Sequence, residues 1–200
     1  MSRENVFCGR GLDPALTPDG LAMAEAFANA YGEMRWEAIY TSPLRRAVAT
    51  GAPLAAVTGK TAIRHPGFAE VDYGKWDGLS VEVVEARWRV EYHRWVADPA
   101  WNAPVGGETA IALAQRMTDA VEEIAAAHPD GGDVLVVSHK AAIRVLLCAL
   151  LGVDVGRFRY RFGCPVGSVT VVSFGAYGPL AESVADRSHL SAALRSLPGT

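Results

Sequence analysis

Two short segments of the sequence end at side chains that bind anions. Residues 134–138 run directly into His139 and Lys140, and residues 36–41 are followed at once by a segment that carries Arg46. Imidazole, ammonium and guanidinium groups donate charge-assisted hydrogen bonds, and the planar fork of arginine matches the oxygens of a phosphate group. Taken singly, each of these residues is more often a structural or solvated side chain, so the pattern favours a phosphate site only if the fold brings them together.

The elements that would position these side chains follow from periodicity. Residues 36–41 and 134–138 have the character of short strands, and helical segments over residues 42–57 and 141–151 follow them. This repeated order of strand and helix predicts an α/β sheet with helices on its faces. Ligands of such sheets bind at the carboxyl ends of the strands, where the next helix presents unpaired N–H groups. We therefore expect both cationic segments at one edge of the sheet.

The remaining segments complete the same unit. Thr17 is the expected N-cap of a helix over residues 18–31. Residues 105–127 are predicted as a helix with an apolar stripe, and residues 168–174 alternate like a strand. Residues 67–79 are rich in loop formers, so they are expected to connect elements rather than form one.

The composition bounds the class of protein. Of 200 residues, 50% are hydrophobic and 20% are charged, which is enough apolar material for a substantial core. We predict one domain over residues 1–181, followed by a weakly patterned tail over residues 182–200, without an internal repeat or a long linker. The net charge of −3 is interspersed along the chain, so no basic face for a nucleic acid is predicted.

Cysteine usage and hydropathy bear on the compartment. Cys8, Cys148 and Cys164 are far apart and lack the paired spacing of a zinc site or a redox motif, so we expect no metal and a reducing setting. The longest apolar run is too short to cross a bilayer, and the first residues lack the apolar core of a signal peptide. The expectation is a cytoplasmic protein without a membrane partner.

Four stretches, in this order along the chain, together resemble the histidine phosphatase superfamily, also called the phosphoglycerate-mutase-like family. They are TSPLRRAVAT (residues 41–50), AEVDYGKWDG (69–78), GGET (106–109) and VVSHKAAIR (136–144). The resemblance implies a three-layer α/β/α sandwich with a mostly parallel sheet. It also implies hydrolysis of a small phosphorylated substrate through a phosphohistidine intermediate, without a metal or a cofactor, and it is compatible with a homo-oligomer.

The resemblance gives roles to three residues. In the family, a histidine attacks phosphorus, a carboxylic acid protonates the leaving oxygen, and two arginines and a second histidine hold the phosphoryl oxygens. Matched position by position, Arg46 resembles the second arginine, His139 the second histidine and Glu70 the general acid and base. These roles suit phosphoryl transfer, which depends on positioning, charge stabilisation and a proton donor for the leaving alkoxide. Without the resemblance, Glu70 would be predicted as a surface carboxylate.

Other residues near the predicted site have less definite roles. Backbone N–H groups around Cys8 and Gly9 are expected to add donors to the phosphate. Lys140 stands where the family usually has glycine, and its cation either adds charge to the phosphate pocket or narrows it. Glu108 is predicted to cap a helix, with the alternative that it orients a group in the active site.

The nucleophile of the family stands in an Arg-His-Gly motif at the end of a first strand, and this sequence contains no Arg-His-Gly. The stretch ENVFCG (residues 4–9) resembles the Glu-Asn-Arg-Phe-Thr-Gly that follows that motif in the mutase branch. We therefore expect both the nucleophile and the first strand of the sheet upstream of Met1.

Three explanations of this absence are open. In the first, the start is mis-set or the chain is truncated. In the second, the strand has been lost, and the product is a catalytically inactive protein that binds a phosphorylated ligand or a partner. In the third, Cys8 replaces the histidine, which requires a lowered thiol pKa. Removing an interior strand would uncover several apolar side chains, at roughly 1.5–3 kcal/mol each, and would leave backbone groups unpaired. This cost favours the first explanation, unless another strand, a partner chain or dimerisation fills the gap.

Within the family, the phosphatase branch fits better than the mutase branch. The mutases carry a lysine shortly after their Tyr-Gly-x-x-x-Gly motif and an adjacent pair of arginines, which grip the carboxylate and second phosphate of the substrate. Here residues 81–84 occupy the lysine region, and no adjacent arginine pair follows in that segment. Phosphoglycerate mutase activity is therefore less favoured than phosphatase activity.

Overall fold

The computed structural model describes residues 6–197, so residues 4 and 5 of the stretch ENVFCG lie outside the described part. The strands are β1 (Trp36–Thr41), β2 (Ala62–Arg64), β3 (Asp133–Val137), β4 (Val169–Gly175) and β5 (Gly178–Asp186). The α-helices are α1 (Pro18–Tyr31), α2 (Arg45–Thr58), α3 (Val81–Arg87), α4 (Arg89–Ala97), α5 (Ala110–Ala127), α6 (Lys140–Leu150) and α7 (Ala192–Arg195). Short 3-10 helices cover Pro66–Phe68 (η1), Gly74–Trp76 (η2) and Val155–Tyr160 (η3).

The central sheet is parallel, in the order β2-β1-β3. Its strands end level with one another, because Thr41 of β1 lies opposite Arg64 of β2 and Val137 of β3. The predicted α/β class with a mostly parallel sheet is confirmed. Strands β4 and β5 form a separate antiparallel hairpin.

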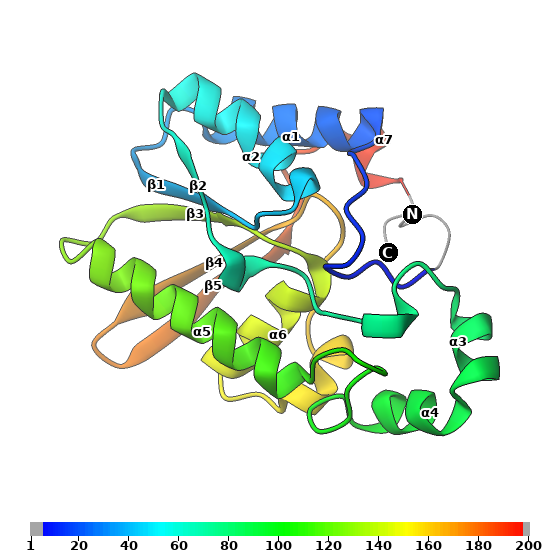
Figure 1. The fold of residues 1–200 in the computed structure, drawn as a ribbon. Coiled ribbons are helices and arrows are strands. Elements are labelled where there is room, and N and C mark those ends of the chain that lie inside the picture. Colours follow the sequence, from blue (N-terminus) through cyan, green and yellow to red (C-terminus); the bar gives the residue numbers. More distant parts are fainter. Residues whose placement is uncertain (1–5, 198–200) are drawn as a thin grey trace.

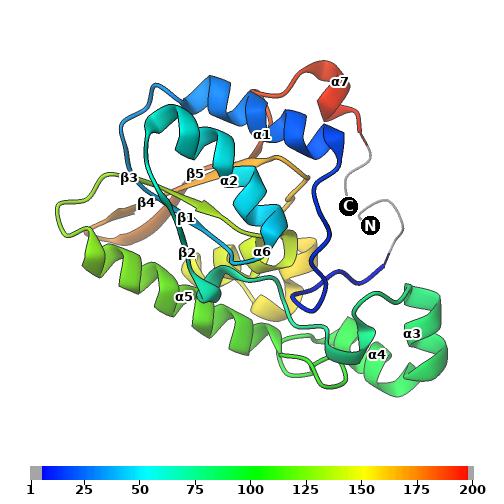
Figure 2. The same cartoon turned by 45° about the horizontal axis from the view of Figure 1, so that its top comes forward.

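Helices cover both faces of this sheet. Figures 1 and 2 show α1 and α2 over one face and α5 and α6 over the other. Side chains of β1 alternate between the two layers: Ile39 packs with Phe27 of α1 and Leu54 of α2, whereas Tyr40 packs with Met117 of α5. The predicted three-layer arrangement is therefore present.

A second apolar cluster lies beside the carboxyl end of the sheet, where α3 and α4 extend away from the layers (Figure 1). Phe7, Trp76, Val84 and Trp95 form its buried centre. Phe7 also exchanges backbone hydrogen bonds with this part, since its N–H donates to the Leu79 carbonyl at 3.0 Å and its carbonyl accepts from the Gly78 N–H at 2.8 Å. The cluster thereby fixes the segment that begins at residue 6 next to the strand ends.

Several predicted boundaries differ from the structure. Helix α5 begins at Ala110 rather than at residue 105, because Gly106 turns the chain with a φ of 74° and the Thr109 hydroxyl caps the helix by accepting from the Ala112 N–H. The predicted domain boundary after residue 181 falls inside β5, so residues 182–186 continue a paired strand. The N-cap at Thr17, the extent of α1 and the extent of β1 agree with the prediction.

Across residues 6–197, every helix is too short or too polar to span a bilayer.

Candidate functional site

His139 lies at the carboxyl end of β3, directly before α6, and only 8% of it is exposed. Its Nδ1 accepts a hydrogen bond from Arg46 Nε at 3.3 Å, and its Nε2 lies 2.7 Å from Ser42 Oγ. Because Nδ1 is an acceptor, the neutral ring carries its proton on Nε2 and donates it to Ser42. Burial, together with the positive charges of Arg46 and Arg116, lowers the pKa of His139 to about 3. The imidazole is therefore a neutral donor at physiological pH.

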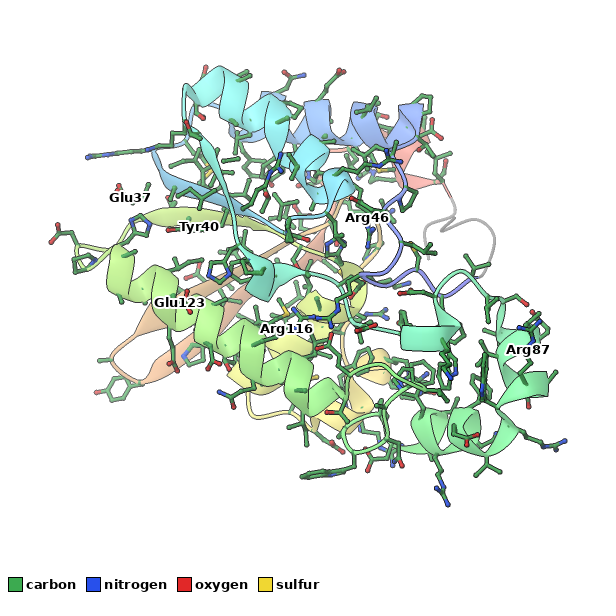
Figure 3. The ribbon with its side chains drawn as sticks, viewed as in Figure 1. Glu37, Tyr40, Arg46, Arg87, Arg116 and Glu123 are labelled. Atoms are coloured by element: carbon green, nitrogen blue, oxygen red, sulfur yellow. The ribbon has the colours of Figure 1, made fainter. Side chains whose placement is uncertain are left out.

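Arg46 joins three segments at this edge from the first turn of α2 (Figure 3). Besides its bond to His139, its Nη1 donates to the Leu12 carbonyl at 2.6 Å and its Nη2 donates to the Gly9 carbonyl at 3.1 Å. Asp13 adds a carboxylate oxygen 3.6 Å from Nη1. A guanidinium group has five N–H donors, so Nη2 retains one for a ligand.

Glu70 is buried, with 6% exposure, so the surface position expected of an isolated glutamate is not what the structure shows. Its Oε1 accepts from the N–H groups of Val71 at 2.8 Å and Ala142 at 3.0 Å, and its Oε2 accepts from the Ala141 N–H at 3.2 Å. Burial raises the pKa of Glu70, and these hydrogen bonds and the charge of Arg46 oppose the rise. A carboxyl group with a raised pKa keeps its proton to higher pH, as a general acid requires.

Helix α6 links the carboxyl group of Glu70 to the imidazole of His139. Ala141 and Ala142 are its second and third residues, and His139 directly precedes the helix. The N-terminal N–H groups of a helix favour an anionic or polar acceptor, which explains why Glu70 is bound there. The structure thus brings together Arg46, Glu70 and His139, the three residues for which the family resemblance implies catalytic roles.

Lys140 lies on the first turn of α6 and is partly buried. Burial, and then the positive charge of Arg144 one turn further along, lower the pKa of Lys140. Within residues 6–197 its ammonium group has no ion pair with a carboxylate, although the charge of Glu70 acts on it and opposes the fall of its pKa.

The segment around Cys8 and Gly9 contributes in a different way from the one predicted. The Gly9 N–H already donates to the Asp77 carboxylate, which leaves the Gly9 carbonyl to hold Arg46. The thiol of Cys8 is half-buried, and burial raises its pKa despite the nearby charge of Arg46. A raised pKa disfavours the thiolate, so the structure speaks against Cys8 as the nucleophile.

Glu108 and Arg116 form an ion pair that sequence reasoning did not identify. The prediction that Glu108 caps a helix is wrong, because Thr109 caps α5. Glu108 instead accepts from the Asp72 N–H at 2.8 Å and binds Arg116 Nη2 at 2.7 Å. The only sequence signal for Arg116 was a cation on the face of a helix whose next residue, Met117, is buried in the core.

The other histidines are engaged elsewhere. His65 follows β2, but its Nε2 lies 2.9 Å from Glu123 Oε2 on α5, and His128 Nε2 lies 3.1 Å from the Tyr40 hydroxyl. His93 pairs with a glutamate on α3, and His189 contacts two aromatic rings of α1 edge to face. Of the five histidines in the sequence, only His139 contacts Arg46 or Ser42.

Comparison with known proteins agrees with this geometry. The sequence matches the histidine phosphatase superfamily (branch 1) over residues 1–187. Phosphoserine phosphatase 1 of Hydrogenobacter thermophilus is 34% identical over 161 residues, which cover 80% of this chain and 75% of that protein. The family match over residues 1–187 contains Arg46, Glu70 and His139.

Solved structures share the fold. Bacillus stearothermophilus YhfR superposes with a TM-score of 0.86 at 23% identity, over 94% of this chain and 92% of YhfR. A mycobacterial glucosyl-3-phosphoglycerate phosphatase, solved with inorganic phosphate, superposes with a TM-score of 0.82 at 28% identity, over 92% of this chain and 93% of that one. The arrangement of helices around the parallel sheet is therefore that of known phosphatase structures.

Proposed function

This chain belongs to the histidine phosphatase superfamily, and from that membership we propose that it is a phosphomonoester hydrolase acting through a phosphohistidine intermediate. The observation that carries the proposal is the contact of a neutral, buried imidazole with a guanidinium group, His139 with Arg46, beside a buried carboxyl group, Glu70. Charge stabilisation and proton donation are the two tasks that phosphoryl transfer asks of a protein.

The proposed reaction has two displacements. A nucleophilic imidazole attacks phosphorus, a P–N bond forms, and the P–O bond to the substrate alcohol breaks while Glu70 gives its proton to the departing oxygen. Water then attacks phosphorus, Glu70 takes a proton from it, and the P–N bond breaks to release phosphate. In both steps the remaining Nη2 donor of Arg46 is proposed to hold a phosphoryl oxygen. The Nε2–H of His139, which donates to the Ser42 hydroxyl at 2.7 Å in the free protein, is proposed to turn to a second phosphoryl oxygen, and the ammonium of Lys140 to add positive charge.

The nucleophilic histidine is proposed to come from a strand outside the residues described. Support comes from β3, which pairs with β1 on one edge only among residues 6–197. Because the Val137 carbonyl accepts from Ser42, Val137 faces β1, and Val136 faces the other edge. A further parallel strand on that edge would end beside His139, where its last residues could present an imidazole to the phosphorus.

A small phosphomonoester is the proposed substrate. The names of the relatives, phosphoserine phosphatase and glucosyl-3-phosphoglycerate phosphatase, each specify a small phosphorylated molecule. The cationic groups at the site are few and local, and the net charge of −3 supports no nucleic-acid partner. The proposed enzyme needs no metal or cofactor, because side chains supply the charge that balances the phosphate, and its expected compartment is the cytoplasm.

The test uses the protein isolated from its native cells. It is incubated with a 32P-labelled aryl phosphate in the presence of EDTA and quenched in alkaline detergent, and protein-bound label and released phosphate are measured. We expect turnover to persist in EDTA and the label to be stable in alkali and labile in acid, as a phosphohistidine is. The intact mass of the same sample reveals any residues that precede Met1.

The contrary result is equally definite. If the sample neither releases phosphate nor retains label, the catalytic proposal is wrong. The alternative, an inactive protein that binds a phosphorylated ligand, then predicts heat of binding on titration with inorganic phosphate, and loss of that heat in Arg46→Ala.

A further inference from the structure

Arg116 is bonded to the loop that carries Glu70 more extensively than an ordinary surface arginine would be. From the middle of α5, its Nη1 donates to the carbonyls of Gly67 at 2.7 Å and Ala69 at 2.9 Å, and its Nη2 donates to the Glu70 carbonyl at 3.0 Å. Figure 3 shows its guanidinium group turned from α5 towards the interior of the molecule. One planar group therefore fixes the carbonyls of three residues in a segment that, within residues 6–197, pairs with no strand.

Glu108 holds this guanidinium group in place. Its two carboxylate oxygens accept from Arg116 Nε at 3.1 Å and Nη2 at 2.7 Å, the side-on geometry in which arginine is most strongly oriented. The same carboxylate accepts from the Asp72 N–H at 2.8 Å. Arg116 thus binds the carbonyls of the residues up to and including Glu70, and Glu108 binds the N–H group of Asp72, so the ion pair holds the backbone on both sides of the Glu70 side chain.

We propose that Arg116 and Glu108 are positioning residues for Glu70, fixing the backbone from which its carboxyl group reaches the N-terminus of α6. This inference rests on the proposed function, because it gives the ion pair a part in the proton transfer of that reaction. The hydrogen bonds of Glu70 to Ala141 and Ala142 are 3.2 and 3.0 Å long, so a small displacement of the loop would break them. A general acid that is displaced by about 1 Å loses much of its rate advantage.

A purely structural role makes a different prediction. The side chains of Arg116 and Glu108 are 22% and 13% exposed, so removing either one destabilises the protein to some extent in any case. Loss of stability lowers the concentration of active enzyme equally for every substrate. A displaced acid slows only those substrates whose leaving group needs a proton.

The first experiment measures kcat and KM of the full-length protein from its native cells, in the Arg116→Gln, Arg116→Lys and Arg157→Gln forms. The substrates are an aryl phosphate, whose leaving group departs unprotonated, and an alkyl phosphate, whose leaving group does not. Arg157 is the control, since its partners, Asp154 and the Ala97 carbonyl, lie outside the segment 67–72 that Arg116 and Glu108 hold. We expect Arg116→Gln to lower kcat about 100-fold on the alkyl phosphate and less than about fivefold on the aryl phosphate, with partial rescue in Arg116→Lys and no change in the control. Equal losses on both substrates would overturn the proposal.

The second experiment does not depend on turnover. Amide hydrogen exchange is measured at Ala141 and Ala142, whose N–H groups bind Glu70, and at Leu147, which is buried in the same helix. We expect Arg116→Gln to speed exchange at the first two amides at least about tenfold while Leu147 stays unchanged. Unchanged exchange at Ala141 and Ala142 would overturn the positioning role. If the protein lacks phosphatase activity but shows this pattern, only the proposed function fails.

A milder variant covers a failure to fold. Glu108→Gln keeps one oxygen acceptor for Arg116. We expect it to speed exchange at Ala141 and Ala142 by at least about a third of the factor measured in Arg116→Gln, again without a change at Leu147. A protein that folds and keeps wild-type exchange at Ala141 and Ala142 in this variant counts against the proposal.

Discussion

Strand β3 has a paired edge and, among residues 6–197, an open edge, and the two sides are built differently. On the paired side, the Ser42 N–H binds the Val137 carbonyl at 2.8 Å, and the imidazole, guanidinium and carboxyl groups of the site are hydrogen bonded. On the other side, the backbone groups of β3 have no strand partner among residues 6–197; residues 134–137 are only partly buried, and Val171 of the β4–β5 hairpin is 44% exposed. The groups proposed to bind and protonate a substrate are therefore held by hydrogen bonds within the described residues, while the open edge is suited to the further strand that we propose.

The largest expected effect is that of His139→Ala in the form of the protein that carries the nucleophile. Removing the imidazole takes a donor from the phosphoryl oxygens and leaves Arg46 Nε without its acceptor. We expect kcat to fall by about 100- to 1,000-fold, the loss typical of a key charge-stabilising donor, while far-UV circular dichroism stays close to that of the wild type.

His93→Ala is the matched control for this prediction. His93 lies on α4, where its ring is half-exposed and pairs with Glu85, so its removal should leave kcat unchanged. If His139→Ala turned over substrate at the wild-type rate, His139 would have no part in the reaction, and the contrast between the two sides of β3 would not hold.

The pH dependence of stability sharpens the same contrast. Unfolded histidine takes up a proton below a pKa of about 6.5, whereas folded His139 does so only near 3. Between these values the unfolded state binds more protons, so the free energy of unfolding falls as the pH falls from about 6.5 to about 3. The raised pKa of Glu70 acts in the opposite direction, since the folded carboxyl gains its proton at a higher pH than the unfolded one.

Urea unfolding of the wild type and of His139→Gln at pH 7, 5.5 and 4 separates these two contributions, because the variant retains Glu70. We expect the wild type to lose, relative to the variant, an amount that grows to on the order of 3 kcal/mol at pH 4. A constant difference across this range would mean that His139 titrates normally in the folded protein.

Some parts of the molecule could be predicted from local patterns in the sequence, and others could not. The N-cap at Thr17 and the strand Trp36–Thr41 depend on local patterns, and both were predicted correctly. The grouping of Arg46, Glu70 and His139 came from motifs, since nothing local to Glu70 indicates that it is buried. Burial of a carboxylate is decided by distant partners, here the first amides of α6.

Two features were not predictable for physical reasons. Strand β5 was missed because its larger apolar residues point outward: Leu180 is 62% exposed and Val184 is 40% exposed. The ion pair of Glu108 with Arg116 was missed because Arg116 binds backbone carbonyls of a loop. Every residue has such a carbonyl, so the order of side chains in the sequence does not indicate the contact. Glu108 next to the capping residue Thr109 resembled a cap itself.

A smaller effect is expected for Glu70→Gln, which keeps the shape of the side chain but cannot serve as an acid. The loss of kcat on an alkyl phosphate should be about 100-fold, and on an aryl phosphate, which needs no proton at its leaving oxygen, less than about tenfold. Steady-state kinetics on the two substrates measures the difference. Equal losses of kcat on both substrates would mean that Glu70 contributes to binding or stability and not to proton donation, and the proposed general acid would then be wrong.

The smallest effect concerns the backbone of β3 itself. In the chain of 200 residues, the N–H groups of Leu135 and Val137 face β1, whereas those of Val134 and Val136 face the open edge. Amide hydrogen exchange should therefore be at least about tenfold slower at the first pair than at the second.

In a longer form of the protein whose extra strand occupies this edge, Val134 and Val136 should become as protected as their neighbours, because every backbone group of β3 would then be paired. Equal protection already in the chain of 200 residues would mean that the edge is covered by some other contact, and the proposed position of the nucleophile would have to be abandoned.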